Sequence, residues 1–313
     1  MQENKDNSLT KEDIDVLKFL ERYKILKIED ASLIYKTKRY YRNRVNKLIG
    51  REYVKRYKEY IMLDKKGRKV LGITGTGYIK NICNKSYMER LKHISNIATI
   101  TINSSIEFIP SWEIKNKNIY TDTARRYIGK MIIDEKEYLT YYISNKKEHV
   151  YIKQILFDIN KAMFSKNIIV FLEGLNIVDN KYGNLMFDKE NTYIIVNNKE
   201  NKELLKKYVE LDIHEIMQGI YKKELLISDW EYADYLLDNN KYIINMIFIN
   251  TEVISRLNWF YKENSNTKKE VEIVTIKENE EKIKELLRHY CKIIKIDKNL
   301  IGGISENIEE SIV

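Results

Sequence analysis

The sequence predicts a mixed α/β protein with two domains: a small helical domain that ends in a β-hairpin (residues 1–77, linker included) and a larger α/β domain (residues 78–313). Three observations support this division. Apolar residues recur at helical spacing near the N-terminus, and two short β-rich runs follow them. Glycines then cluster at residues 72–78, where we expect a linker. Beyond them, strand-like and helix-like segments alternate, as is typical of an α/β domain.

The first helix is expected to begin near Thr10. Thr10 and Asp13 occupy the two positions of a capping box, in which each side chain accepts the backbone N–H of the other residue. Ile14, Leu17 and Leu20 then provide an apolar stripe at helical spacing. A short second helix is predicted over residues 28–35.

The third helix is predicted over Thr37–Ile49, and Gly50 provides the residue type that often ends a helix. Tyr53–Tyr57 and Tyr60–Leu63 are predicted to be strands joined at Lys58 and Glu59. Three helices followed by a hairpin is the order of a winged helix-turn-helix. One face of the third helix is expected to be buried, and its apolar members are Tyr41, Val45, Leu48 and Ile49.

The opposite face of this helix carries Arg39, Arg42, Asn43 and Asn46, and this spacing favours DNA binding. Arg and Asn side chains can contact guanine and adenine edges in the major groove with two hydrogen bonds each. Neighbouring basic residues are placed to contact phosphates. The hairpin adds three more basic residues, positioned for a minor groove or for the adjacent DNA backbone. The complete set of expected DNA-binding residues is Thr37, Lys38, Arg39, Arg42, Asn43, Arg44, Asn46, Lys47, Lys55, Arg56 and Lys58.

Positive charge is concentrated in this part of the chain. The whole chain of 313 residues has a formal net charge of +9, and residues 36–69 contain 14 Lys and Arg against three acids. This segment therefore carries +11, and the remaining residues carry about −2. AT-rich codons raise the Lys content of a whole chain and do not explain a local excess. The distribution therefore favours double-stranded DNA as a partner over a merely solvated basic helix.

No catalytic site, metal site or cofactor is predicted. The glycines at 72–77 lack the following Lys-Ser/Thr pair of a phosphate-binding loop, and the four histidines are scattered. Cys83 and Cys291 match no metal-ligand spacing, so we expect reduced, buried thiols. No apolar run reaches the roughly 18–20 residues of a membrane span. The first residues do not resemble a secretion signal, so a cytoplasmic location is expected.

In the second domain, no internal sequence repeat is evident, and the last dozen residues are acidic. Helices are predicted over Ser86–Ile100, Val150–Phe164, Lys202–Val209 and Glu278–Tyr290. Strands are predicted over Tyr138–Ile143, Asn167–Leu172, Thr192–Val196, Val271–Ile276 and Lys292–Ile296. The last two strands and the helix between them are predicted to form a βαβ unit.

Three runs of sequence, Leu9–Leu17, Tyr40–Ile49 and Tyr60–Leu71, resemble the plasmid replication-relaxation proteins. These are mobile-element proteins of Gram-positive bacteria with an N-terminal winged helix. The resemblance implies a sequence-specific DNA-binding protein that recognises repeats at a plasmid origin to initiate or control replication, with host replication proteins as candidate partners.

In that family the second region often resembles a restriction-endonuclease fold, whose metal site needs an Asp and then an acid-x-Lys on a neighbouring strand. Here the strand that follows Asp134, Tyr138–Ile143, carries neither an acid nor a Lys. The resemblance therefore implies a degenerate nuclease fold that acts as a scaffold or dimerisation domain, and we expect no enzyme and a homodimer. A winged-helix transcriptional regulator is the first alternative, and a nuclease or nicking protein is the second.

Overall fold

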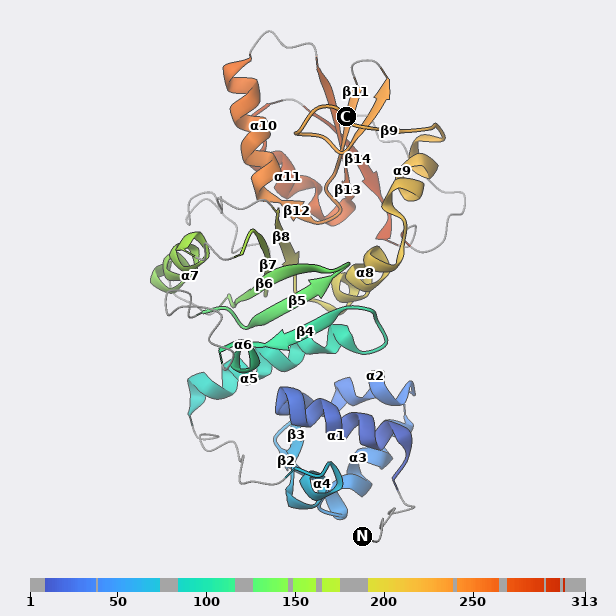
Figure 1. Ribbon diagram of the computed structural model, residues 1–313, viewed down its shortest axis with the longest axis vertical. Helices are drawn as coiled ribbons and strands as arrows, with labels where there is room; N and C mark the ends of the chain where they lie inside the picture. The colour runs from blue at the N-terminus through green and yellow to red at the C-terminus, as the bar shows by residue number, and fades with distance from the viewer. Residues whose placement is uncertain are drawn as a thin grey trace. The chain divides into compact units, whose positions relative to one another are not determined.

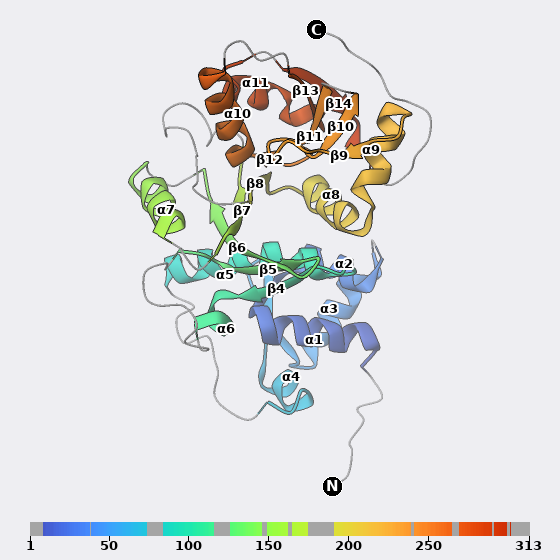
Figure 2. The ribbon, with the colours of Figure 1, turned by 45° about the horizontal axis from the view of Figure 1, so that its top comes forward.

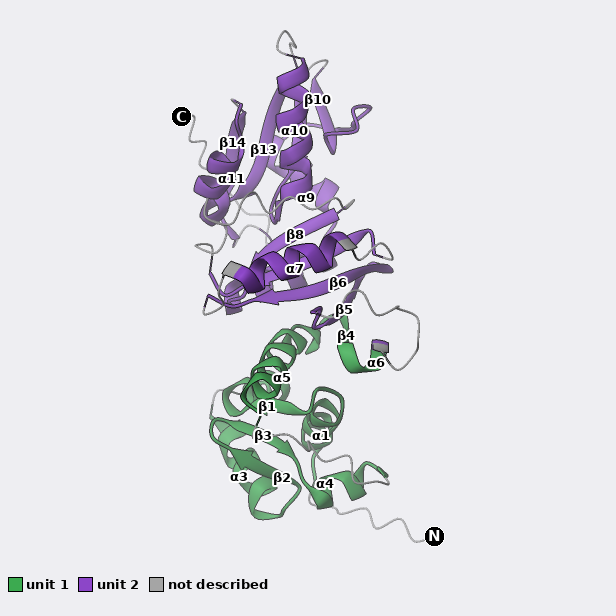
Figure 3. Cartoon of the chain, turned by 90° about the vertical axis from the view of Figure 1, so that its left-hand side faces the viewer, with its two compact units in different colours: residues 1–113 green, residues 114–313 purple. Residues whose placement is uncertain are grey.

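The structure is a computed structural model. It describes residues 9–37, 39–73, 84–115, 126–145, 149–161, 165–174, 191–238, 241–264, 269–289, 291–298 and 301. The chain contains both helices and strands, as expected, and divides into two compact units, Met1–Glu113 and Ile114–Val313 (Figure 3). The expected division at residues 77 and 78 falls inside unit 1. Lys38, Cys83, most of the glycine cluster and residues 302–313 lie outside the described residues.

Unit 1 begins with a helical domain that contains one small antiparallel sheet, of strand order β1-β3-β2 (Figure 1). The elements, in chain order, are α1 (Lys11–Tyr23), β1 (Ile25–Lys27), the 3-10 helix η1 (Ile28–Asp30), α2 (Ala31–Tyr35), α3 (Tyr40–Gly50), β2 (Val54–Tyr57), β3 (Tyr60–Leu63) and α4 (Lys65–Val70).

Helix α1 begins with the expected capping box. The backbone N–H of Asp13 donates to Thr10 Oγ1 at 3.3 Å, and the backbone N–H of Thr10 donates to Asp13 Oδ2 at 2.9 Å. Leu17 and Leu20 are buried, as the apolar stripe predicts. The helix ends where Lys24 adopts a left-handed backbone with φ 73°.

Helix α3 begins at Tyr40, three residues later than predicted. Lys36 ends α2 with a left-handed φ of 53°, so the helical backbone is interrupted at this residue. Thr37 therefore precedes the helix, and Arg39 is its N-cap. At the other end, Gly50 is still helical, and it is Glu52 that has the positive φ, 63°.

The sequence analysis missed two elements of this domain. Strand β1 has only three residues, and its extended state depends on its pairing with β3, where Ile25 lies opposite Met62. Helix α4 is capped by Asp64, whose carboxylate accepts the N–H of Lys65 at 2.8 Å. Gly67 lies within α4, where a Cβ would collide with the carbonyl of Tyr53, so this position requires close backbone approach.

The remaining elements of unit 1 are α5 (Lys85–Ala98), the 3-10 helix η2 (Thr99–Thr101), β4 (Glu107–Pro110) and the first three residues of α6 (Ser111–Lys115). Helix α5 packs against the small sheet. Met88 and Leu91 join Ile25 and Met62 in one buried cluster, and Ser95 Oγ donates to the carbonyl of Ile25 at 2.6 Å. This helix therefore belongs to the core of the N-terminal domain.

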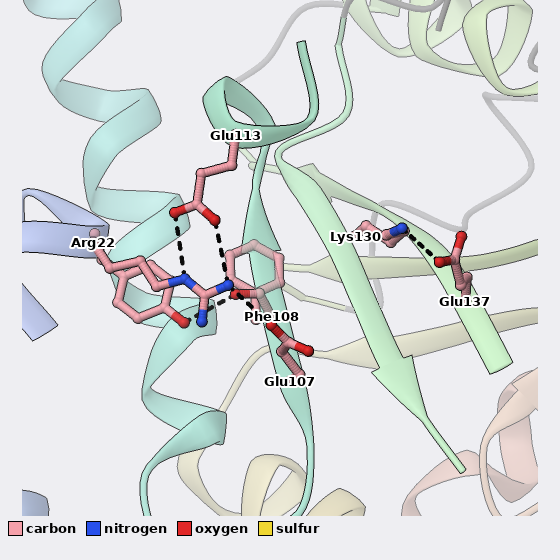
Figure 4. A network of polar contacts seen from close by, with 7 residues as sticks. Arg22, Glu107, Phe108, Glu113, Lys130 and Glu137 are labelled. Carbon is pink, nitrogen blue, oxygen red and sulfur yellow. Dashed lines mark hydrogen bonds and ion pairs between the residues drawn. The ribbon is translucent and has the colours of Figure 1, made fainter. Parts of the chain in front are cut away.

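Arg22 ties α1 to the end of unit 1 (Figure 4). Its Nη2 donates to Glu107 Oε1 at 3.0 Å, and its Nε donates to Glu113 Oε1 at 3.3 Å. The hydroxyl of Tyr23 also donates to the carbonyl of Phe108 at 2.9 Å. These contacts between residues far apart in the sequence explain why the unit extends to Glu113 instead of ending near residue 77.

Unit 2 contains two sheets. In the first, the strands follow the order β12-β8-β7-β6-β5. Strands β5 and β6 form an antiparallel hairpin, and β6, β7 and β8 are parallel. Its elements, with the helices that follow, are β5 (Gly129–Ile133), β6 (Lys136–Ile143), α7 (His149–Lys161), β7 (Asn167–Leu172), β8 (Asn191–Val196), α8 (Lys199–Glu210) and α9 (Ile213–Tyr221).

The second sheet has the order β14-β13-β11-β10-β9. Strands β11, β13 and β14 are parallel, and β9 and β10 are antiparallel. Helices α10 and α11 lie beside this sheet in both views (Figures 1 and 2). Its elements, with β12 of the first sheet, are β9 (Leu226–Ile227), β10 (Tyr235–Asp238), β11 (Lys241–Asn245), β12 (Ile249–Asn250), α10 (Thr251–Glu263), β13 (Glu270–Ile276), the 3-10 helix η5 (Lys277–Asn279), α11 (Glu280–Leu286) and β14 (Lys292–Ile296).

The two sheets of unit 2 are built from strands and helices that follow one another along the chain in the same order. A hairpin (β5–β6 or β10–β11) is followed by a helix (α7, or α10 after the short strand β12), a parallel strand (β7 or β13) and a second parallel strand (β8 or β14). This repetition has no counterpart in the sequence, where no repeat is evident. The predicted βαβ unit near the C-terminus is confirmed as β13-α11-β14.

Candidate functional site

Helix α3 has one buried and one exposed face. Tyr41, Val45 and Leu48 are at most 5% exposed, as the apolar pattern predicts, whereas Ile49, expected on the same face, is only partly buried. Five polar residues expected at the DNA surface are exposed, and they are Arg39, Arg42, Asn43, Asn46 and Lys47. Thr37 is also exposed, but it lies in the turn before the helix. Lys38 lies outside the described residues.

Arg44 was expected to contact a DNA phosphate, but its side chain is only 11% exposed. The guanidinium forms an ion pair with Asp13 of α1, whose side chain is fully buried. Arg44 Nε donates to Asp13 Oδ1 at 3.2 Å, and Nη2 donates to Oδ2. The hydroxyl of Tyr35 donates to the same carboxylate at 2.6 Å. Asp13 therefore links α1, α2 and α3, and Arg44 belongs to the interior.

The sequence contained a signal for the burial of Arg44. It lies three residues after Tyr41 and four before Leu48, which places it on the apolar face of the helix. A charged residue on a buried face requires a partner of opposite charge. The capping residue Asp13 is that partner, and its second role in the ion pair was not foreseen.

The environment of Asp13 favours the ionised carboxylate. Burial by itself would raise the pKa of Asp13, but the hydrogen bonds from Arg44, Tyr35 and Thr10 outweigh this effect and hold the pKa below its ordinary value. The same hydrogen bonding raises the pKa of Arg44. The pair is therefore ionic at neutral pH.

The β2–β3 hairpin adds basic side chains to the surface of the domain. Arg56 and Lys58 are exposed, and Lys55 is partly buried. Lys58 lies in the two-residue turn with a left-handed φ of 53°, and its carbonyl accepts a hydrogen bond from Arg56 Nε at 2.9 Å. This bond holds the Arg56 side chain against the turn of the hairpin.

Two further contacts shape the exposed face of α3. Arg42 Nε donates to the hydroxyl of Tyr41 at 3.1 Å, and the hydrogen bond raises the pKa of Arg42. Glu29 of η1 exerts a weaker electrostatic attraction on Arg42. The carboxylate of Glu29 is itself bonded to Lys27 Nζ at 2.7 Å. The surface therefore retains a net positive character.

Within the described part of the chain, no group of three or more His, Cys, Asp or Glu side chains is arranged to hold a metal ion. Asp134 lies in the β5–β6 turn, where its φ is 46°. On that hairpin, Lys130 and Glu137 pair with each other at 2.6 Å (Figure 4). Cys291 is partly buried, and burial raises the pKa of its thiol to about 11, so it is protonated at neutral pH.

Two acids of unit 2, Glu173 and Asp212, have local structural partners. Glu173 Oε2 accepts hydrogen bonds from Ser144 Oγ at 2.6 Å and from the backbone N–H of Asn145 at 2.9 Å. Asp212 caps α9 and accepts the N–H of His214 at 2.9 Å. Among the described residues, neither acid belongs to a group of three or more His, Cys, Asp or Glu side chains that could hold a metal ion.

Comparison of the chain with protein-family models, with curated proteins and with solved structures finds no match. Among the described residues, no helix has both the length and the apolar character needed to cross a membrane.

Proposed function

We propose that residues 9–73 form a winged helix-turn-helix that binds double-stranded DNA. In this proposal α3 enters the major groove, and the β2–β3 hairpin is the wing. The order of elements supports it, because α1, β1, α2, α3, β2 and β3 follow one another as in that fold. The major groove is about 12 Å wide and accepts one α-helix.

The observation that carries the proposal is the two-faced character of α3. Tyr41, Arg44, Val45 and Leu48 are buried in the domain. The polar residues that remain exposed are Arg39, Arg42, Asn43, Asn46 and Lys47. A recognition helix needs this separation, since one face must pack on its own domain while the other meets base edges and phosphates. The exposed residues of the hairpin, Arg56 and Lys58, extend the basic surface beyond the helix.

The test is fluorescence anisotropy of the full chain with a labelled duplex of random sequence at low salt. The double variant Arg39→Ala/Lys47→Ala should weaken binding about tenfold, because each phosphate contact contributes through counterion release. Lys207→Ala is the matched control, since Lys207 is an exposed lysine of α8 in unit 2. Equal losses in both variants, or no binding by the wild type, would refute the assignment.

The wider role that we propose rests on the resemblance to plasmid replication-relaxation proteins. It is recognition of repeated sites at the origin of a plasmid or other mobile element in the cytoplasm, without catalysis. Footprinting on DNA around the gene distinguishes this role from transcriptional regulation. Protection of several iterated repeats supports replication control, and protection of a single promoter site contradicts it.

A homodimer completes the proposal. One winged helix covers a short site and seldom discriminates well against a genome of competing sequences. Pairing two copies makes the second contact intramolecular and raises the overall affinity. Sedimentation of the full chain at micromolar concentration should therefore show a dimer, and a strictly monomeric chain would contradict this part of the proposal.

A further inference from the structure

Tyr41 and Arg42 form a linked pair at the boundary between the buried and exposed faces of α3. The Tyr41 side chain is only 5% exposed and is fixed in the core of the domain. Arg42 is exposed, yet its Nε donates a hydrogen bond to the Tyr41 hydroxyl at 3.1 Å, and its guanidinium carbon lies 5.8 Å from the centre of the Tyr41 ring. A fixed hydroxyl therefore anchors a side chain that would otherwise be free to rotate.

The anchoring leaves the far end of the guanidinium available. Within the described part of the chain, the two terminal nitrogens of Arg42 have no hydrogen-bond partner, because the bond to Tyr41 uses Nε. Two parallel N–H groups of this kind match the O6 and N7 acceptors of guanine in the major groove. An arginine held in place before binding also loses less conformational entropy when it forms those bonds.

We propose that Tyr41 positions Arg42 to recognise a guanine, so that the DNA site of this protein contains a guanine opposite α3. Arg42 touches the base, and Tyr41 is a positioning residue that acts through it. The inference rests on the proposed binding of DNA by α3 and specifies the base that is recognised. Glu29 attracts Arg42 less than Tyr41 does, and its Oε2 accepts a hydrogen bond from Lys27 at 2.7 Å.

The experiment uses the full chain and a library of random duplexes to select a preferred site. Each guanine of that site is then replaced by 7-deazaguanine, which lacks the N7 acceptor. One replacement should weaken wild-type binding by roughly fivefold or more, as expected for loss of part of a two-bond contact. The same replacement should not change the affinity of the Arg42→Ala variant for the duplex.

Tyr41→Phe keeps the buried ring and removes only the hydroxyl. Its discrimination between guanine and 7-deazaguanine should fall by roughly 2- to 10-fold, the cost of ordering one flexible side chain during binding. Tyr53→Phe is the matched control, because Tyr53 is a fully buried tyrosine of the same unit and should retain wild-type discrimination. Thermal unfolding of both variants verifies that each one folds.

Arg42→Lys provides a second arm that does not depend on the folding of Tyr41→Phe. Lysine keeps the positive charge but cannot donate two parallel hydrogen bonds to one base. This variant should therefore no longer discriminate between guanine and 7-deazaguanine, while its binding should keep the wild-type salt dependence. Wild-type discrimination in Tyr41→Phe would overturn the positioning role. Equal weakening of all duplexes by Arg42→Ala would show a phosphate contact and overturn guanine recognition. Failure of the wild type to bind any duplex would instead refute the proposed function itself.

Discussion

The ion pair between Asp13 and Arg44 makes a strong prediction about the stability of unit 1. Asp13→Asn preserves the shape of the side chain and removes its charge. The Arg44 side chain, 11% exposed, would then lie in the interior without a counter-charge. Breaking a buried pair by removing one partner costs about 3–5 kcal/mol. Asparagine can still accept hydrogen bonds, so we expect the lower end of that range, about 3 kcal/mol.

Hydrogen exchange measured by mass spectrometry is the suitable assay, because it reports on α1 and α3 separately from unit 2. A single unfolding transition of the whole chain would mix the two units. A loss of about 3 kcal/mol corresponds to exchange roughly a hundredfold faster at amides that open with the domain. Glu21→Gln removes a charge from an exposed residue of the same helix and should leave these rates unchanged.

A second variant separates the charge effect from simple loss of packing. Adding Arg44→Met to Asp13→Asn removes the unpaired guanidinium and keeps most of the apolar volume, so protection should partly recover. The reasoning would be refuted if Asp13→Asn exchanged at the wild-type rate. It would equally be refuted if the double variant were less protected than Asp13→Asn alone.

Three more predictions follow from particular residues. Hydrogen bonds hold the pKa of Asp13 in the folded protein below its value in the unfolded chain, which is about 3.9. The ionised carboxylate therefore contributes fully to the stability of unit 1 above about pH 3.9, and this contribution is lost as the pH falls through the pKa of the folded state. The difference in hydrogen exchange between wild type and Asp13→Asn should therefore shrink below about pH 4, and a constant difference down to pH 2 would contradict the ion pair. DNA binding should weaken with salt with a log–log slope of roughly −5, for about six phosphates neutralised, and Lys58→Ala should reduce the slope by about one. Binding titrations that show no salt dependence would exclude the basic surface. Gly67→Ala should destabilise unit 1 by about 1–3 kcal/mol because its Cβ would meet the Tyr53 carbonyl, whereas Gly50→Ala, with nothing within 4 Å, should be neutral or slightly stabilising in thermal unfolding.

Local signals in the sequence located α1, α3 and the hairpin of unit 1. The capping pair Thr10 and Asp13 marked the start of α1, and β3 lies at Tyr60–Leu63 as predicted. Such signals are reliable because capping and turn geometry involve residues within a few positions of one another. In unit 2, β7 and β14 also agree with their predicted bounds.

Other elements of unit 2 were missed, among them α10 (Thr251–Glu263) and the short strands β9, β10 and β12. Strands of two to four residues carry too little alternating pattern to be distinguished from loops. Their extended backbone depends on partners elsewhere in the chain. Ile249, for example, pairs with Ile194 of β8.

For the candidate site, the sequence by itself separated the exposed from the buried face of α3, except at Arg44, which is buried, and Ile49, which is only partly buried. Periodicity separates two faces of a helix, but it cannot decide whether an Arg at the border pairs with an acid of another helix. Only the tertiary structure brought Asp13, Tyr35 and Arg44 together and directed that Arg inward.

The sequence alone also determined that the chain is a mixed α/β protein whose positive charge is concentrated near α3, because composition and local pattern are properties of neighbouring residues. Only the tertiary structure decided that unit 1 extends to Glu113 and that unit 2 repeats one strand order. Both features depend on contacts between residues that lie far apart in the sequence. Ser95 bonded to Ile25, and Arg22 bonded to Glu113, are contacts between residues about 70 and 90 positions apart, and no local pattern records them.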